Sequence, residues 1–179
     1  MIFHWWLRLL SVVWYILCFG FILPVTLLLI TVSLDQLAHG WFGVGLAPNG
    51  FLLAASMLFG LAGLVLLGLS TMALHREGKG WPWSFGSHAA FNPQHLVTSG
   101  PYAYVRHPMG SAYLLFLIAV GCLVPSLTLL LWIVPLAGGL LYEYFGFTEE
   151  KRLRHWFGDE YEAYHSRTAS LLPRLGTRL

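Results

Sequence analysis

Charged residues are scarce in this chain of 179 residues: aspartate, glutamate, lysine and arginine make up 10% of it, against 57% apolar residues. This composition, with its long apolar runs, excludes a soluble domain and is typical of a protein that crosses the membrane several times. The net charge of +2 is small and the cations are scattered, so nucleic acid is not an expected partner. We expect a single integral-membrane domain over residues 1–179, in contact with the lipid bilayer, and the sequence leaves its oligomeric state open.

Cysteine is rarer still. Cys18 and Cys122 both lie in apolar segments, where they are expected to be small buried side chains and not part of a disulfide framework. The sequence contains neither a CxxC pair nor an HExxH run, and its 8 histidines are dispersed. No metal site is therefore predicted.

Four apolar segments are long enough to approach or span a bilayer core of ~30 Å as helices. They are expected at residues 9–32, 51–74, 108–124 and 126–147. The last two must form an antiparallel hairpin, because one straight helix over both would be about twice as long as the bilayer is thick. Pro125 and Ser126 supply the turn, with Ser126 as candidate N-cap. The predicted fold is an all-α membrane protein with about four transmembrane helices, a C-terminal helical hairpin and an amphipathic cytoplasmic tail helix over 151–167.

The first span ends, by this interpretation, before a glycine-rich stretch. Residues 33–50 contain Asp35, several glycines and no lysine or arginine, so we expect a loop there. A cleaved signal peptide is the alternative for the first apolar segment, since Arg8 precedes it. The segment is longer than a signal core of about 7–15 residues and lacks a small-residue exit, which favours a retained span. In the second span, Gly60, Gly63 and Gly68 predict close approach of another helix.

The distribution of cations predicts the orientation. With four spans, both termini and the connection between the second and third spans lie on one side of the membrane. That side then carries every lysine and arginine: Arg8, Arg76, Lys79, Arg106, Lys151, Arg152, Arg154, Arg167, Arg174 and Arg178. By the positive-inside rule, both termini and this connection are expected in the cytoplasm.

The connection ends in a dense polar stretch, LVTSGPYAYVRHP, over residues 96–108. The pair Gly100-Pro101 signals a turn, and Pro108 keeps the residue before it out of helical geometry. Arg106 and His107 should therefore project from an ordered loop directly before a helix. The alternative is an interfacial anchor, because cations often border membrane helices.

A second polar cluster, EEKRLRHWFGDEYEAY, begins at residue 149. Together the two clusters read G-x-Y-x-x-x-R-H-P and E-E-x-x-L-x-x-x-F-G-x-x-Y-x-x-Y. In both blocks and their order the second half of the chain resembles the small integral-membrane methyltransferases that include isoprenylcysteine carboxyl methyltransferase and the phospholipid methyltransferases. The matching residues are Gly100, Tyr102, Arg106, His107, Pro108, Glu149, Glu150, Leu153, Phe157, Gly158, Tyr161, Tyr164 and Pro173. Members of the family usually have a tyrosine two residues after the proline, where this chain has Gly110.

The resemblance implies S-adenosyl-L-methionine as cofactor. It also implies that residues of both clusters bind this cofactor, which is possible because the hairpin returns both clusters to the same membrane face. The cofactor-binding set expected from it is His95, Leu96, Val97, Gly100, Tyr102, His107, Pro108, Glu149 and Glu150. The expected catalytic residues are Arg106, Glu150 and Tyr113, which lies one helical turn beyond Gly110. Arg106 would orient a carboxylate acceptor, whereas Glu150 or His107 would take the proton from an amine or thiol.

The expected acceptor is a lipophilic small molecule or a lipidated molecule that reaches the site from the bilayer, and Gly110 is expected to widen its pocket. Glu143, within the last span, is expected to have a functional or ion-paired role, because a carboxylate in the membrane is costly. Two alternatives to methyl transfer remain: a nicotinamide-dependent reductase of the membrane sterol type, and a non-catalytic membrane protein with a degenerate site.

Overall fold

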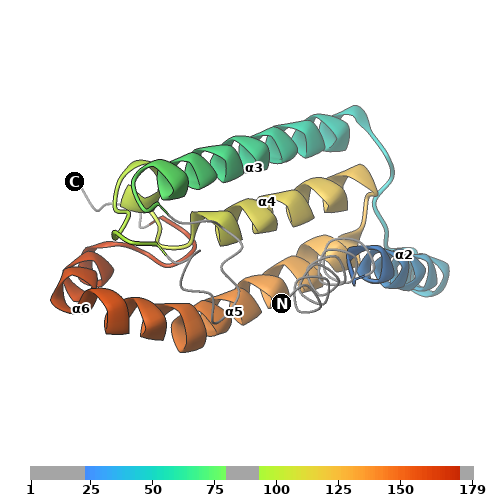
Figure 1. The fold of residues 1–179 in the computed structure, drawn as a ribbon. Helices are drawn as coiled ribbons and strands as arrows, with labels where there is room; N and C mark the ends of the chain where they lie inside the picture. Colours follow the sequence, from blue (N-terminus) through green and yellow to red (C-terminus); the bar gives the residue numbers. More distant parts are fainter. Residues whose placement is uncertain (1–22, 80–92, 174–179) are drawn as a thin grey trace, which may run out of the picture.

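The computed structural model describes residues 23–79 and 93–173, and every regular element in these two ranges is helical. The α-helices are α2 (Leu23–Phe42), α3 (Gly50–Arg76), α4 (Pro108–Leu123), α5 (Val134–Tyr144) and α6 (Glu150–Arg167). A 3-10 helix, η3 (Gly100–Ala103), and two π-helical segments, η4 (Leu129–Ile133) and η5 (Phe145–Glu149), complete the order shown in Figure 1. The all-α prediction is confirmed.

Three helices in the described ranges are long and apolar enough to cross a membrane: Val25–Phe42, Gly50–Arg76 and Leu129–Arg167. The fourth expected span, α4, is also apolar, but it has only 16 residues and a length of ~24 Å. Many of the large apolar side chains on these helices are exposed, as expected of surfaces that face lipid. The chain is therefore an all-helical membrane protein.

The expected loop over residues 33–50 is wrong in its first half. Helix α2 continues through Asp35 to Phe42, and the chain turns only at Gly43, whose φ is +66°. The Gly43 amide donates to the carbonyl of His39 at 2.9 Å, which closes the last turn of the helix. The helix stops at a glycine that can adopt the left-handed conformation, and the earlier polar residues do not end it. Residues 9–22 of the expected first span lie outside the described residues.

Helices α3 and α4 pack side by side (Figure 1). A Cβ atom added to Gly63 would lie 3.2 Å from the Phe116 ring and 3.3 Å from the carbonyl of Ala112, so a larger residue would be tight at this distance between the helices. Gly60 also faces α4, at Ala119. The predicted close approach is confirmed at these two glycines, whereas Gly68 has no atom near its Cβ position.

The hairpin turns at Pro125-Ser126 as predicted, and Ser126 caps the second arm, since its Oγ accepts from the amide of Leu129 at 3.1 Å. The carboxylate of Asp35, from α2, joins this cap. It accepts a hydrogen bond from the Ser126 hydroxyl, from the Thr128 amide at 2.9 Å and from the Thr128 hydroxyl at 2.7 Å. A carboxylate at a helix N-terminus is favourable, so Asp35 fixes α2 against the hairpin turn.

The second arm does not end at residue 147 as expected. It runs from residue 127 through η4, α5 and η5 directly into α6. The π-helical η4 stands next to Pro135, which has no amide for the Leu131 carbonyl four residues earlier, and a wider turn relieves the clash with that carbonyl. Gly158, with φ 49° and ψ −125°, then bends α6 and turns its second half back toward the hairpin (Figure 1).

Residues 168–171 follow α6 and run beside the polar loop. Val105 and Ala169 form an isolated parallel bridge, and the Arg106 amide donates to the Ala169 carbonyl at 2.8 Å. The His107 amide donates to the carbonyl of Ser170 at 3.0 Å, and the Ser111 hydroxyl donates to the carbonyl of Leu171 at 2.5 Å. The loop therefore lies between the helices and this segment, which we call the C-terminal strap.

Candidate active site

The loop that carries Arg106 and His107 is held by a turn at one end and a helix start at the other. Gly100 has φ +57° and leads into η3, and Pro108 is the first residue of α4. Between them the Tyr164 hydroxyl, from α6, donates to the carbonyl of Tyr102 at 2.7 Å. The loop is thus ordered by α6 as well as by the strap, which explains how the two distant sequence clusters meet.

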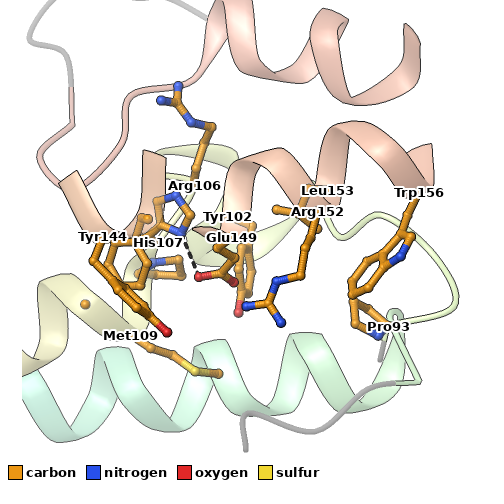
Figure 2. Close-up of a pocket in the computed structure, with 13 residues that line it drawn as sticks. Pro93, Tyr102, Arg106, His107, Met109, Tyr144, Glu149, Arg152, Leu153 and Trp156 are labelled. Atoms are coloured by element: carbon orange, nitrogen blue, oxygen red, sulfur yellow. Dashed lines mark ion pairs between the residues drawn. The ribbon is translucent and has the colours of Figure 1, made fainter. Parts of the chain in front are cut away.

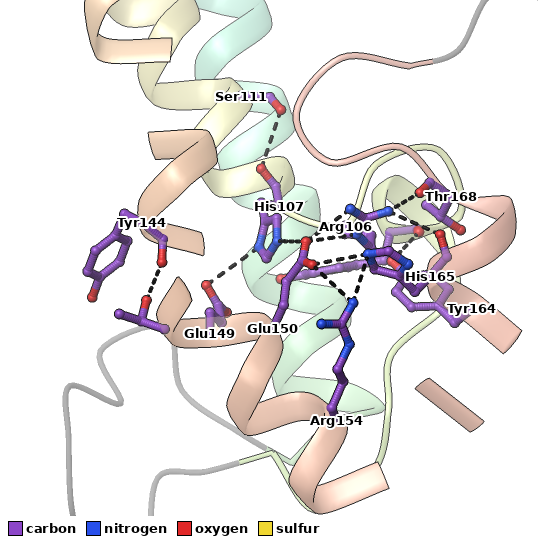
Figure 3. Close-up of polar contacts among 12 residues, drawn as sticks. Arg106, His107, Ser111, Tyr144, Glu149, Glu150, Arg154, Tyr164, His165 and Thr168 are labelled. Carbon is purple, nitrogen blue, oxygen red and sulfur yellow. Dashed lines mark hydrogen bonds and ion pairs between the residues drawn. The ribbon is translucent and has the colours of Figure 1, made fainter. Parts of the chain in front are cut away.

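Arg106 and Glu150 form a buried ion pair across the two clusters. The Arg106 Nη2 and Nε atoms lie 3.0 Å and 3.1 Å from Glu150 Oε1, and both side chains are 7% exposed. Arg106 Nη1 also donates to the carbonyl of Thr168 and, at 3.1 Å, to that of His165. Nearly all of its donors are therefore occupied within the protein (Figure 3).

His107 lies between the two glutamates. Its Nε2 is 3.3 Å from Glu150 Oε1 and its Nδ1 is 3.5 Å from Glu149 Oε2, and its ring stacks on Phe145 at a centroid distance of 4.2 Å. Burial lowers the pKa of His107, but its hydrogen bonds to Glu149 and Glu150 outweigh that effect and raise the pKa above its ordinary value of 6.5. The imidazole is stabilised as a cation between two anions.

His165 completes the buried cluster and was not predicted from the sequence. Its Nε2 lies 3.1 Å from Glu150 Oε2, although fifteen residues of straight helix would separate the two by about 22 Å. The bend at Gly158 brings them together. A helix-breaking glycine in the middle of α6 was the only sequence signal for this contact.

Beside this cluster, α4, α6 and η5 enclose a cavity of about 200 Å³ (Figure 2). Its lining includes Tyr102, His107, Glu149, Arg152 and Trp156. The side chain of Glu149 is 45% exposed, in contrast to the buried Glu150, and the Arg106 guanidinium points away from Glu149 in Figure 2. Burial and the nearby Glu149 carboxylate raise the pKa of the Tyr102 hydroxyl, which stays protonated. The cavity thus presents a carboxylate, a guanidinium and aromatic rings to one space.

The structure brings together only part of the expected site. Arg106, Tyr102, His107, Pro108 and Glu149 line the cavity, and Glu150 lies directly behind it. Five other expected residues do not line it: His95, Leu96, Val97, Gly100 and Tyr113.

These five residues have other positions. Val97 is buried against the end of α3, near Gly78, Leu96 is half-buried, and His95 and Gly100 are exposed. Tyr113 is 41% exposed on α4. Arg152 and Trp156 line the cavity but were not predicted, because a helical tail pattern does not show which face is turned to the loop.

Gly110 lines the cavity, and part of the space beside it is occupied by neighbouring side chains. Gly110 is buried, and a Cβ atom placed on it would lie 2.6 Å from the Phe145 ring and 2.9 Å from Leu171. Phe145 fills the space beside this glycine and stacks on His107 at the same time. The glycine therefore admits a ring from η5, and the expectation that it widens the acceptor pocket stays a prediction.

Comparison with known proteins places the site in a family. The family model described as phospholipid methyltransferase matches residues 51–160, which is more than half of the chain. The match includes the loop with Arg106 and His107 and the first part of α6. The cobalt-zinc-cadmium resistance protein CzcN of Cupriavidus metallidurans is 34% identical over 112 residues, which cover 63% of this chain and 50% of that protein. The chain thus spans about half the length of this curated relative.

Proposed function

The chain belongs to the phospholipid methyltransferase family, and we propose that it transfers a methyl group from S-adenosyl-L-methionine to an amphiphilic acceptor held in the membrane. The observation that carries the proposal is the convergence of the two sequence clusters around one cavity. His107 from the loop and Glu149 from the hairpin's second arm lie 3.5 Å apart there, at the end of the helices (Figure 3).

The side chains of the cavity suit the proposed methyl donor. Its amino acid part has a carboxylate, which fits the Arg152 guanidinium, and an ammonium, which fits the half-exposed Glu149. The indole of Trp156, at the same cavity, offers a flat apolar surface for an adenine ring. The charges of the lining therefore match those of the proposed donor, and the buried Arg106–Glu150 ion pair does not have to open.

We assign Arg106 and Glu150 positioning roles. Each is the other's main partner, and neither could bind a ligand strongly without leaving a buried charge behind. Their ion pair joins the loop to α6 and holds His107 and Glu149 at the cavity wall.

The bound donor would supply a methyl group attached to a sulfonium, so the enzyme needs no nucleophile of its own. The protein's contribution is then to align the acceptor and to exclude water. For an amine or thiol acceptor, Glu149 faces the cavity while Glu150 is enclosed, so Glu149 would have to take the acceptor's proton instead of binding the donor's ammonium.

We further propose that the acceptor enters from the bilayer. Met109, Tyr144 and Phe145 line the cavity and continue into the apolar surface of α4 and α5. Each methylene buried there could contribute ~0.8 kcal/mol. In methyl-transfer assays with a chain-length series, turnover at low acceptor concentration should rise with chain length. A preference for short, water-soluble acceptors would contradict entry from the membrane.

Equilibrium binding to the purified protein tests the function itself. We expect S-adenosyl-L-methionine to bind, and NADPH not to bind, when each is titrated by calorimetry into the protein in detergent micelles. Binding of NADPH alone would favour a membrane reductase. Binding of neither would favour a protein without catalytic activity.

A further inference from the structure

His165 is in contact with both partners of the buried ion pair, although it belongs to neither of the two sequence clusters. Its main-chain carbonyl accepts a hydrogen bond from Arg106 Nη1 at 3.1 Å. Its Nε2 lies 3.1 Å from Glu150 Oε2 (Figure 3). Since an ionised carboxylate only accepts hydrogen bonds, the imidazole donates to it through a protonated Nε2. One residue near the end of α6 therefore constrains both the arginine of the loop and the glutamate at the start of the helix.

The two carboxylate oxygens of Glu150 have different partners. Oε1 lies 3.0 Å and 3.1 Å from the Nη2 and Nε atoms of Arg106, and 3.3 Å from His107 Nε2. Both arginine donors are thus directed at one oxygen, whereas a guanidinium and a carboxylate frequently pair through two parallel hydrogen bonds that use both oxygens. The imidazole of His165 occupies the oxygen that such a pairing would need.

The surroundings of the imidazole keep it at Glu150 Oε2. The Tyr161 ring packs beside the His165 ring at a centroid distance of 5.9 Å. Arg154 also approaches this oxygen, but its Nη2 is 4.0 Å away, and its Nε pairs with Glu162 at 2.8 Å. The imidazole is therefore the closer donor to Oε2, and the second cation is held on the outer side of the helix.

We propose that His165 is a positioning residue for the cavity: it binds Oε2 of Glu150 so that Oε1 stays within reach of His107. Without the imidazole, the Arg106 guanidinium could take both oxygens of Glu150, and His107 would lose its partner at Nε2. The ring would then no longer be fixed with its Nδ1 3.5 Å from Glu149. The consequence for methyl-donor binding rests on the proposed function, whereas the arrangement of the three side chains does not.

Titration of His107 by NMR, with isotope-labelled histidine and without methyl donor, tests the proposal. The signal is assigned by its absence in His107→Gln. The amide of His165→Asn is too short to reach Glu150, whereas that of His165→Gln can take the place of Nε2. We expect the pKa of His107 to fall in His165→Asn and to keep its wild-type value in His165→Gln. Loss of a nearby positive charge alone would raise this pKa, so the direction separates positioning from a change of charge.

The affinity for S-adenosyl-L-methionine connects this arrangement to the proposed function. Calorimetry should show binding weakened roughly tenfold in His165→Asn and largely kept in His165→Gln. A lower pKa of His107 with unchanged affinity would overturn the role in donor binding. If the wild type does not bind the donor, the proposed function fails, and the titration still decides whether His165 positions His107.

His155→Asn is the matched control, because His155 is exposed on the same helix and does not line the cavity. It should change neither the pKa of His107 nor the affinity. An unchanged or raised pKa in His165→Asn, or an equal fall in His165→Gln, would overturn the proposal. The wild type provides a test that requires no variant to fold: the spectra should show His165 protonated at Nε2, and a proton at Nδ1 alone would also overturn the proposal.

Discussion

Glu149 and Glu150 are neighbours in the chain, but their carboxylates face different surroundings. Glu149 is 45% exposed at the cavity and lies 3.5 Å from His107 Nδ1. Glu150 is 7% exposed and lies 3.0 Å from Arg106 Nη2. Identical residue types at consecutive positions therefore have different surroundings, one at the cavity and one in the protein interior.

The two glutamates should respond differently to the same substitution. Glu149→Gln is expected to weaken S-adenosyl-L-methionine binding roughly ten- to a hundredfold, the effect of a lost charged hydrogen bond, with little change in stability. Glu150→Gln is expected to destabilise the fold by about 3–5 kcal/mol, because it leaves Arg106 buried without its anion. Calorimetry and thermal unfolding of both variants separate the two roles. Equal loss of stability in both would contradict the distinction.

The stability of the protein should depend on the protonation of His107. Its pKa is raised in the folded state, although burial opposes the rise, because Glu149 and Glu150 bind the cation. The stabilisation is then fully present below pH 6.5, the ordinary value, and is lost as the pH rises through the raised pKa. The unfolding temperature of the wild type should fall across this window, and that of His107→Gln should fall less. Parallel curves would show that His107 does not contribute.

The bend in α6 should require glycine. At Gly158 the dihedral angles are accessible to glycine alone, so Gly158→Ala is expected to destabilise the protein by ~1–3 kcal/mol and to displace His165 from Glu150. Gly139→Ala is the matched control. Both glycines have open space at the Cβ position, but Gly139 lies in a regular helix, where alanine should be neutral or stabilising by ~0.5–1 kcal/mol. Similar unfolding temperatures for the two variants would refute the conformational argument.

Asp35 should stabilise the far end of the bundle. Asp35→Ala removes the acceptor for Ser126 and for two donors of Thr128, with an expected cost of ~1–3 kcal/mol. Gln36→Ala changes the next residue, which is exposed on the same helix, and should have little effect. Thermal unfolding of both variants measures the difference. Because the site lies at the other end of the helices, cofactor affinity should not change in either variant (Figure 1).

The proposed cytoplasmic orientation of the site can be tested by labelling. In a cysteine-free background, Ala47→Cys lies in the loop between α2 and α3, and Ser166→Cys lies near the end of α6, both exposed. An impermeant thiol reagent added to intact cells should modify only the first. Modification of Ser166→Cys alone would reverse the orientation.

Much of the helical framework could be predicted from the sequence. The length of the apolar run predicted the bounds of α3 to within two residues at each end, and Pro125-Ser126 predicted the position of the hairpin turn. These features depend on local rules: apolar length, turn residues and capping side chains. The end of α2 was missed for a local reason as well, because Gly43, and not the earlier polar residues, carries the left-handed turn.

The site was predicted less completely. The two clusters predicted that His107 and both glutamates lie close together, but no sequence pattern indicated that Glu149 would be half-exposed and Glu150 buried, or that a π-helical segment would precede them. The contact between Phe145 and Gly110 is a similar case, because the Phe145 ring fills the space beside a glycine that lies thirty-five positions away in the sequence. Such contacts depend on packing between helices. The periodicity of a sequence predicts which face of a helix is buried, but it does not predict which residue of another helix packs against that face.

The C-terminal strap determines when the site can form during synthesis. Every membrane helix of the described chain leaves the ribosome before residues 168–171, which provide the carbonyls for the amides of Arg106 and His107. Until then the loop has no backbone partners on that side, and the Arg106 guanidinium lacks the Thr168 carbonyl. A chain that ends just before the strap would keep its membrane helices, but the loop would lack the carbonyl groups that bind the amides of Arg106 and His107.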